Sequence, residues 1–151
     1  MIIGVPTETA EDENRVAMTP SIAEDLVEGG HGVVVASGAG DASNWSDQQY
    51  EDAGCEILSS RDDVFDRADI VLQVQGLGST DTDTDPYRDG QIAIGLFGPH
   101  DVGDDTLGEL AARNVSAFSL ELMPRISRAQ SMDALSSQSS LGGYKATLLA
   151  A

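Results

Sequence analysis

The stretch TPSIAEDLVEGGHGVVVA, residues 19–36, contains the pattern that decides the fold. Pro20 stands at a favourable first helical position behind Thr19 as a helix N-cap, and apolar residues recur at helical spacing up to Gly29 and Gly30. The run GVVVA at 32–36 then has the length and continuous apolar character of a strand that is buried on both faces. A helix that leads directly into a buried strand is half of a parallel β–α–β unit.

The same alternation extends outward from this stretch in both directions. We expect a strand over 2–5 before the helix. The elements expected after residue 36 are a helix over 46–53, a strand over 55–58, a helix over 60–68, strands over 70–74 and 91–96, a helix over 104–113 and a strand over 116–122. Strands separated by single helices predict an α/β fold: a parallel sheet with helices on both faces, Rossmann-like or flavodoxin-like, in three layers. A chain of 151 residues suits one such domain.

The end of the chain is expected to form a long helix over 131–151, interrupted at Gly142-Gly143. This helix has no stop signal, which indicates a truncated or split subunit. The alternative is a C-terminal helix that docks on the domain and ends there. The polar, acidic segment STDTDTDPYRDG at 79–90 is interpreted as an expanded turn.

Charge is the strongest signal in the composition. The chain has 26 acidic and eight basic residues, a net charge of -18, so nucleic-acid binding is not expected. The acids are scattered through an otherwise globular pattern and lysine is nearly absent, which favours the acidic surface of a halophilic protein over an acidic interaction domain. Residues 122–151 depart from this, with Asp133 against two arginines and one lysine. We expect this neutral-to-basic segment to meet an anionic ligand or to be covered.

Motifs for metals, phosphates and membranes are not found. His31 and His100 lie outside any ligand-spaced cluster, although His100 follows a strand end, and the lone Cys55 is expected to be a small core residue in a reducing compartment. Gly38-Ala39-Gly40 lacks the third glycine of a dinucleotide fingerprint, so the chain is not expected to hold a dinucleotide alone. Neither a signal peptide nor a membrane-spanning run is visible.

Two segments carry candidate binding chemistry. In GVPTETAEDENRVAMTP (4–20), Arg15 is the sole cation after a strand end; it could bind a carboxylate or phosphate as a bidentate fork, or neutralise the acids around it. In PRISRAQSMDALSSQSSLGGY (124–144), polar groups gather at a loop-to-helix junction, where one helix face could bind an amide and ribose hydroxyls or could be solvated. The residues of this second group are Arg125, Arg128, Gln130, Asp133, Ser136, Ser137 and Gln138.

Both segments resemble the alanine dehydrogenase and NAD(P) transhydrogenase N-terminal family. GVPTET…ENRVAMTPSIAEDL resembles the opening signature of the family, with Asp12 in place of its usual asparagine. RISRAQSMDALSSQSSLGGYKA is similar to the segment that precedes the NAD-binding domain in transhydrogenases. The resemblance covers essentially the whole chain, and it is weakest at 79–90.

The resemblance implies a function and a site. Residues 1–130 would form the substrate-side domain and 131–151 a connecting helix toward a Rossmann domain, absent here, that holds NAD(H). Arg125 and Asp133 would orient the carboxamide and ring of the nicotinamide, Ser136 and Ser137 would contribute to the cofactor site, and Gln130 would face the partner domain that carries NADP(H). Gln130 and Asp133 are thus the expected catalytic residues, positioning two rings for direct hydride transfer from NADH to NADP+.

Partners and location follow from the same resemblance. The expected partners are the NAD-binding lobe, a membrane-spanning subunit whose proton flow drives the reaction, an NADP-binding subunit and a second copy of the chain. The protein would then be cytoplasmic and peripheral to the membrane.

Two other functions stay open. In alanine dehydrogenases of the family, an arginine and a lysine hold the carboxylate and carbonyl of the substrate. Arg15 matches the arginine, but the lysine position falls within 71–75 (VLQVQ), where a neutral glutamine cannot replace an ammonium group. The other alternative is a non-catalytic remnant or accessory module that keeps the fold without a cofactor.

Overall fold

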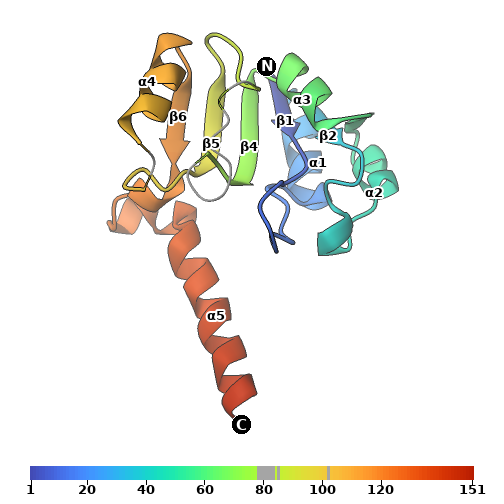
Figure 1. The fold of residues 1–151 in the computed structure, drawn as a ribbon. Coiled ribbons are helices and arrows are strands. Elements are labelled where there is room, and N and C mark those ends of the chain that lie inside the picture. The colour runs from blue at the N-terminus through green and yellow to red at the C-terminus, as the bar shows by residue number, and fades with distance from the viewer. Residues whose placement is uncertain (78–83, 85, 102) are drawn as a thin grey trace.

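A parallel sheet forms the centre of the protein (Figure 1). The computed structural model describes residues 1–77, 84, 86–101 and 103–151. Within these residues the sheet has six strands in the order β3-β2-β1-β4-β5-β6, and each neighbouring pair is parallel. The strands are β1 (Ile2–Val5), β2 (Gly32–Ala36), β3 (Glu56–Leu58), β4 (Ile70–Gln75), β5 (Ile92–Leu96) and β6 (Ser116–Ser119).

The helices begin and end close to where local signals predict. They are α1 (Pro20–Glu28), α2 (Asp47–Asp52), α3 (Arg61–Arg67), α4 (Asp104–Ala112) and α5 (Ala134–Ala150), with 3-10 turns η1 (Asp41–Ser43), η2 (Leu120–Leu122) and η3 (Ser127–Met132). Ser60 caps α3 by accepting the backbone N–H of Asp63 at 3.1 Å. Thr19 occupies the N-cap of α1 as predicted, but its side chain makes no capping hydrogen bond.

The strand order places a topological switch point between β1 and β4. The chain runs outward from β1 through β2 to β3, then crosses to β4 and runs the other way to β6. Right-handed crossovers therefore place α1 and α2 on one face of the sheet, and α3 and α4 on the other. The predicted α/β fold with helices on both faces is confirmed, and the order selects the Rossmann-like alternative over the flavodoxin-like one.

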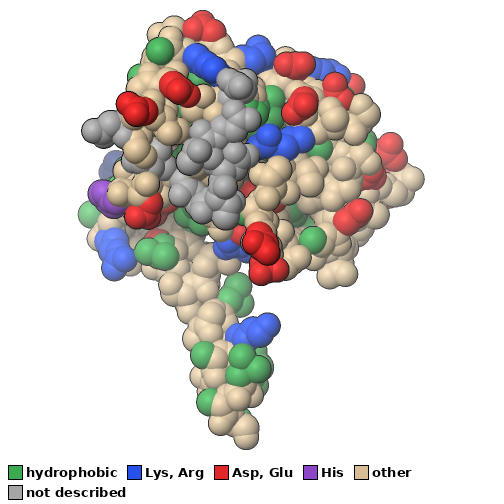
Figure 2. Space-filling view, viewed as in Figure 1, with side chains coloured by type: hydrophobic (Ala, Val, Ile, Leu, Met, Phe, Trp, Pro, Cys, Tyr) green, Lys and Arg blue, Asp and Glu red, His purple; other side chains and the backbone are tan. Residues whose placement is uncertain are grey.

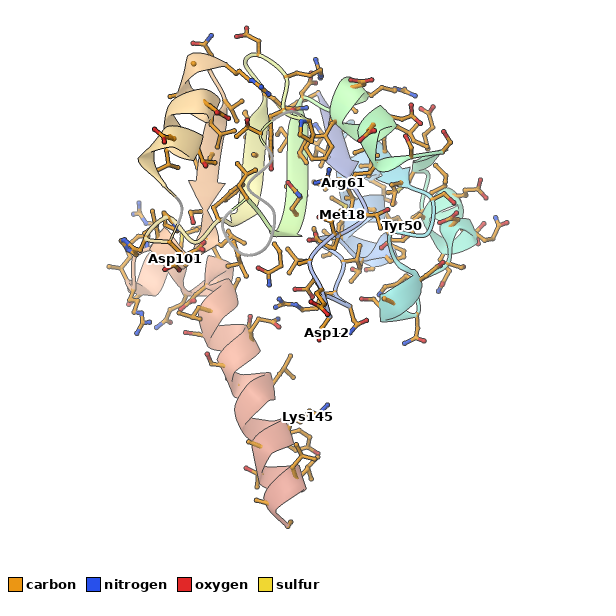
Figure 3. The ribbon with its side chains drawn as sticks, viewed as in Figure 1. Asp12, Met18, Tyr50, Arg61, Asp101 and Lys145 are labelled. Atoms are coloured by element: carbon orange, nitrogen blue, oxygen red, sulfur yellow. The ribbon has the colours of Figure 1, made fainter. Side chains whose placement is uncertain are left out.

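The core anchors the loop that follows β1. Val5, Val35 and Tyr50 are fully buried between β1, β2 and the helices beside them. The Tyr50 hydroxyl donates to the backbone oxygen of Met18 at 2.7 Å, and burial raises the pKa of Tyr50 to about 12. Figure 3 shows these two side chains beside one another. The loop is thus fixed at both ends, by β1 and by Met18.

Two predicted boundaries near the C-terminus were wrong. The strand expected over 116–122 ends at Ser119, and Leu120–Leu122 form a 3-10 turn. The helix expected from residue 131 begins at Ala134, behind Asp133 as N-cap, and runs through Gly142 and Gly143 without a break. Glycine costs about 1 kcal/mol in a helix but still adopts helical angles, so a glycine pair weakens α5 and does not interrupt it.

The helix α5 extends away from the carboxyl edge of the sheet, as Figure 1 shows. Its side chains are largely exposed, including the apolar Leu141, Tyr144 and Leu149. Within the described part of the chain, we find no helix whose length and apolar character would let it cross a bilayer. Residues 79–83 and 85 of the acidic segment 79–90 lie outside the described residues.

Candidate functional site

A pocket of about 500 Å³ opens at the carboxyl edge of the sheet, beside the switch point between β1 and β4. Ligands of open α/β sheets bind at this place because the chain diverges to opposite faces there and leaves a crevice. The loop after β1, the strands β4 and β5, η2 and the first turns of α5 form its walls. The lining residues are Arg15, Val16, Ala17, Thr19, Ser43, Trp45, Gln73, Val74, Leu96, Leu120, Ala134, Leu135 and Gln138.

Arg15 joins the two segments that the sequence singled out. Its Nε donates to Oε1 of Glu13 at 2.7 Å, and its Nη2 donates to Oε2 of the same carboxylate. Its Nη1 donates to Oε1 of Gln138 on α5 at 3.2 Å. In this structure the guanidinium therefore neutralises an acid beside it, which is one of the two roles considered for Arg15, and it also connects the β1 loop to α5.

The charges around Arg15 perturb one another. Hydrogen bonding to Arg15 lowers the pKa of Glu13 to about 2, and Gln75 adds a hydrogen bond from its Nε2 to Glu13 at 2.9 Å. Glu8 accepts the backbone N–H groups of Val74 at 2.6 Å and Gln75 at 3.0 Å, yet burial raises its pKa overall. Glu8 and Glu13 together tie the β1 loop to the end of β4, across the switch point.

Replacing Arg15 by methionine is expected to lower the free energy of unfolding by about 2 kcal/mol at pH 7. The substitution leaves the Glu13 carboxylate, whose side chain is 6% exposed, without its cation. The expected loss of stability is no larger because the Arg15 side chain is itself 41% exposed, so solvent screens its charge. Urea unfolding measures this difference.

The loss of unfolding free energy in the Arg15→Met variant should become smaller as the pH falls. Because the folded-state pKa of Glu13 lies at about 2, below the ordinary value of 4.5, the stability that it contributes is present above pH 4.5 and is lost as the pH falls toward 2. The difference in unfolding free energy between wild type and Arg15→Met should therefore decrease below about pH 4.5. Arg67→Met, which removes an exposed pair with Glu56, is the matched control and should change little. An equal loss in both variants would contradict the account of Glu13.

The junction between η3 and α5 is organised by Asp133. Its Oδ1 accepts the backbone N–H of Ser136 at 3.0 Å, and its Oδ2 accepts the Ser136 hydroxyl at 2.6 Å. These bonds from Ser136 lower the pKa of Asp133, and the positive charge of Arg125 contributes. The Ser137 hydroxyl donates to the backbone oxygen of Ala134 at 2.9 Å. Asp133 and Ser136 thus have a local role in starting α5, besides the cofactor role that the sequence predicts.

The other predicted site residues lie beside the pocket rather than in its lining. Arg125, Arg128, Gln130, Ser136 and Ser137 are exposed in this chain, and η3 is held by the buried Ala129. Gln138 is the member of the predicted polar group that does line the pocket. The structure thus brings Arg125 near Asp133, and Arg15 to Gln138, and leaves the amide of Gln130 open to solvent.

Acidic side chains are spread over the body of the domain in the view of Figure 2, whereas α5 shows none. The single lysine of the sequence, Lys145, lies far along α5 from the pocket (Figure 3). No ammonium group is therefore available from this chain to hold a substrate carboxylate beside Arg15.

Sequence reasoning missed the contribution of Gln73. It treated the glutamines of IVLQVQ as positions where a lysine is absent, but Gln73 is 7% exposed and lines the pocket. A glutamine in an otherwise apolar buried strand was the available signal, because a buried amide needs hydrogen-bond partners.

Histidine and cysteine contribute little to the site. His31 and His100 are exposed, and Cys55 is buried and free, as predicted for a small core residue. Burial raises the pKa of its thiol. Within residues 1–77, 84, 86–101 and 103–151, no three His, Cys, Asp or Glu side chains gather as metal ligands would.

These features define a class of protein. It is an open, parallel α/β domain of Rossmann-like strand order, with a largely apolar pocket at the switch point and a helix that leaves the domain from the wall of that pocket.

The chain belongs to the alanine dehydrogenase/PNT N-terminal domain family, which matches residues 4–142. It is 40% identical over 148 residues to the NAD(P) transhydrogenase subunit alpha of Cereibacter sphaeroides, covering 98% of this chain and 28% of that protein. The transhydrogenase structure from Sinorhizobium meliloti superposes with a TM-score of 0.87 at 36% identity, over 98% of this chain and 41% of that one. An L-alanine dehydrogenase structure is more distant, with a TM-score of 0.73 at 28% identity, over 80% of this chain and 32% of that one.

The comparisons thus place the chain with the N-terminal parts of transhydrogenase alpha subunits. The family is one of oxidoreductases. The chain spans less than half the length of these relatives.

Proposed function

We propose that this chain is the N-terminal, substrate-side lobe of the alpha subunit of a proton-translocating NAD(P) transhydrogenase. The observation that carries the proposal is the charge of residues 122–151, which include the junction of η3 and α5 beside the pocket. This segment has one acid and three bases in a chain whose net charge is -18. Similarity over nearly all of this chain to the N-terminal parts of transhydrogenase alpha subunits supports the same conclusion.

The role of this lobe in the reaction is to position the nicotinamide ring. The nicotinamide of NADH supplies a hydride to NADP+ when both are bound, and this transfer needs no acid or base from the protein. The pocket suits an uncharged ring, because its lining is mostly apolar with a few amide and hydroxyl groups. Arg125 and Asp133 orient the carboxamide, Ser136 and Ser137 complete the cofactor contacts, and Gln130 faces the neighbouring NADP(H)-binding domain.

The proposal includes an arrangement of domains and partners. Residues 1–130 form the lobe, and 131–151 connect it toward a separate lobe that binds most of NAD(H). A membrane-spanning subunit and an NADP-binding subunit complete the enzyme, two copies of the alpha subunit associate, and the lobe is cytoplasmic at the membrane surface. We do not expect hydride transfer from the isolated chain, because the fold described here lacks a glycine-rich turn at a helix N-terminus for a diphosphate.

Reconstitution tests this function. The chain is combined with a transhydrogenase NAD-binding lobe and an NADP-binding subunit, and NADPH formation from NADH is followed. Hydride transfer that requires this chain supports the proposal. A mixture whose other components bind their nucleotides but transfer no hydride would overturn it.

The alanine dehydrogenase alternative has less support. Its site would need a cation beside Arg15, and Gln75 donates its amide to Glu13 there instead. The same reconstituted mixture should therefore not reduce NAD+ when alanine is added.

We also propose that the excess of acids adapts the surface to high salt. At a net charge of -18, like charges repel one another across the folded surface. Salt screens this repulsion, because the Debye length falls from about 10 Å at 0.1 M to about 3 Å at 1 M. Raising KCl from about 0.1 M to about 2 M should increase Tm by about 5 °C or more. Calorimetry at several KCl concentrations measures this, with a neutral osmolyte as control. A Tm that is flat or falls with KCl would contradict salt adaptation.

A further inference from the structure

Gln73 presents a buried hydrogen-bond donor to the pocket. Its side chain is 7% exposed, and its Oε1 accepts the hydroxyl of Tyr87. Its Nε2 then has no hydrogen-bond partner among the residues that the structure describes. Gln73 lines the pocket, and its Nε2 keeps some accessible surface. A donor in this position costs stability unless a ligand or water accepts from it.

Gln138 supplies a second donor, from a different element in the lining of the same pocket. Its Oε1 accepts from Nη1 of Arg15. Because a guanidinium has donors and no acceptor, the amide must turn its oxygen toward Arg15, which leaves its NH2 group for other partners. Gln138 lines the same pocket as Gln73, from α5 rather than β4. The orientation of the Gln138 amide therefore follows from the chemistry of the two groups.

The remainder of the lining carries no unpaired charge among the described residues. Arg15 is matched by Glu13, and the larger surfaces come from Trp45, Leu96 and Leu135. A ligand carboxylate would lose its hydration there without gaining a free cation. A flat apolar ring that carries a neutral carbonyl oxygen would instead bury its faces and accept from the amide donors.

We infer that Gln73 and Gln138 are specificity-determining residues, which donate to the carbonyl oxygen of an uncharged aromatic carboxamide and discriminate against a carboxylate. The identity of this ring as the nicotinamide end of NAD(H) rests on the proposed function. The two glutamines thus contact the carboxamide from the walls of the pocket, in addition to the contacts proposed for Arg125 and Asp133 from the junction of η3 and α5.

Ring fragments test this inference on the chain itself. Nicotinamide, 3-methylpyridine (the ring without a carbonyl) and nicotinate (the carboxylate) are titrated in turn, and amide chemical shifts are followed by NMR. We expect nicotinamide to bind about tenfold more tightly than either other ring, since one buried hydrogen bond contributes up to about that factor. Gln73→Met keeps an unbranched side chain but removes the donors, so it should bring nicotinamide and 3-methylpyridine to nearly equal affinity.

Two further variants separate binding from folding. Gln138→Leu changes an exposed side chain, so it should leave Tm nearly unchanged and still reduce the preference for nicotinamide. Gln48→Met, an exposed position on α2, is the matched control and should keep the full preference.

The inference is overturned if wild type binds the three rings equally, if both Gln73→Met and Gln138→Leu keep the preference, or if none of the rings shifts pocket resonances at about 50 mM, beyond the range of weak binding. These titrations involve no hydride transfer. A failed reconstitution with an intact ring preference would count against the proposed function and not against the role of the two glutamines.

Discussion

Replacing Gln130 by asparagine is expected to slow hydride transfer about 100-fold in the reconstituted enzyme, while the affinity for NADH changes by less than about threefold. The shorter side chain withdraws its amide by about 1 Å. When catalysis depends on the orientation of the reacting rings, a misplacement of that size can slow the reaction about 100-fold. Affinity for NADH should be less affected because the proposed function assigns most contacts to the dinucleotide to the other lobe. Gln130 is exposed here, so the folded lobe should not lose stability.

Asp133→Asn extends the same test to the N-cap of α5. Asparagine caps a helix about as well as aspartate, so the variant keeps α5 and removes the charge beside Arg125. We expect its rate to fall as for Gln130→Asn, and Asp133→Ala to lose the cap as well. Single-turnover rates and NADH titrations measure the two effects separately, with Gln48→Asn as control. Unchanged rates in both asparagine variants would remove Gln130 and Asp133 from the site.

Gly4→Ala is expected to destabilise the fold by about 3 kcal/mol or more. A Cβ at Gly4 would lie 2.6 Å from Cβ of Ala68 and 2.7 Å from Cγ1 of Val64. Both neighbours are fully buried, and neither atom belongs to the far end of a flexible side chain. The helix α3 would therefore have to move away from β1, beside the switch point.

Gly32→Ala is the matched control, since it also adds a methyl group to a strand glycine. Its nearest side-chain neighbour is Cγ1 of Ile2 at 3.5 Å, which is ordinary contact. Urea unfolding should show a large loss for Gly4→Ala and a change within about 0.5 kcal/mol for Gly32→Ala. Equal losses would mean that the tight packing of α3 on β1 is not what requires glycine at this position.

Most of the fold could be predicted from the sequence because its signals are local. The apolar run at 32–36, Pro20 at the start of α1 and Gly29-Gly30 at its end each fix an element within a few residues. The strand order could not be predicted, since the same alternation fits Rossmann-like and flavodoxin-like sheets. The interruption predicted at the glycine pair in α5 was wrong, because the continuity of a helix depends on cooperative backbone hydrogen bonding as well as on residue propensity.

The candidate site was predicted in its segments but not in its contacts. Arg15 and Gln138 are far apart in sequence, and the fold alone shows that they meet. Glu13 could not be selected among the acids around Arg15, and Gln73 gave no periodic signal. No signal in the sequence explained the glycine at Gly4, which the close approach of Val64 and Ala68 explains in the structure.

Amide hydrogen exchange of the chain, assembled with a transhydrogenase NAD-binding lobe, tests the central claim most directly. The claim is that the junction of η3 and α5 faces the bound nucleotide. Adding NADH should slow exchange over 125–138, most of whose side chains are exposed in the free chain, and leave α2 unchanged. Exchange over 125–138 that is the same with and without bound NADH would contradict the account.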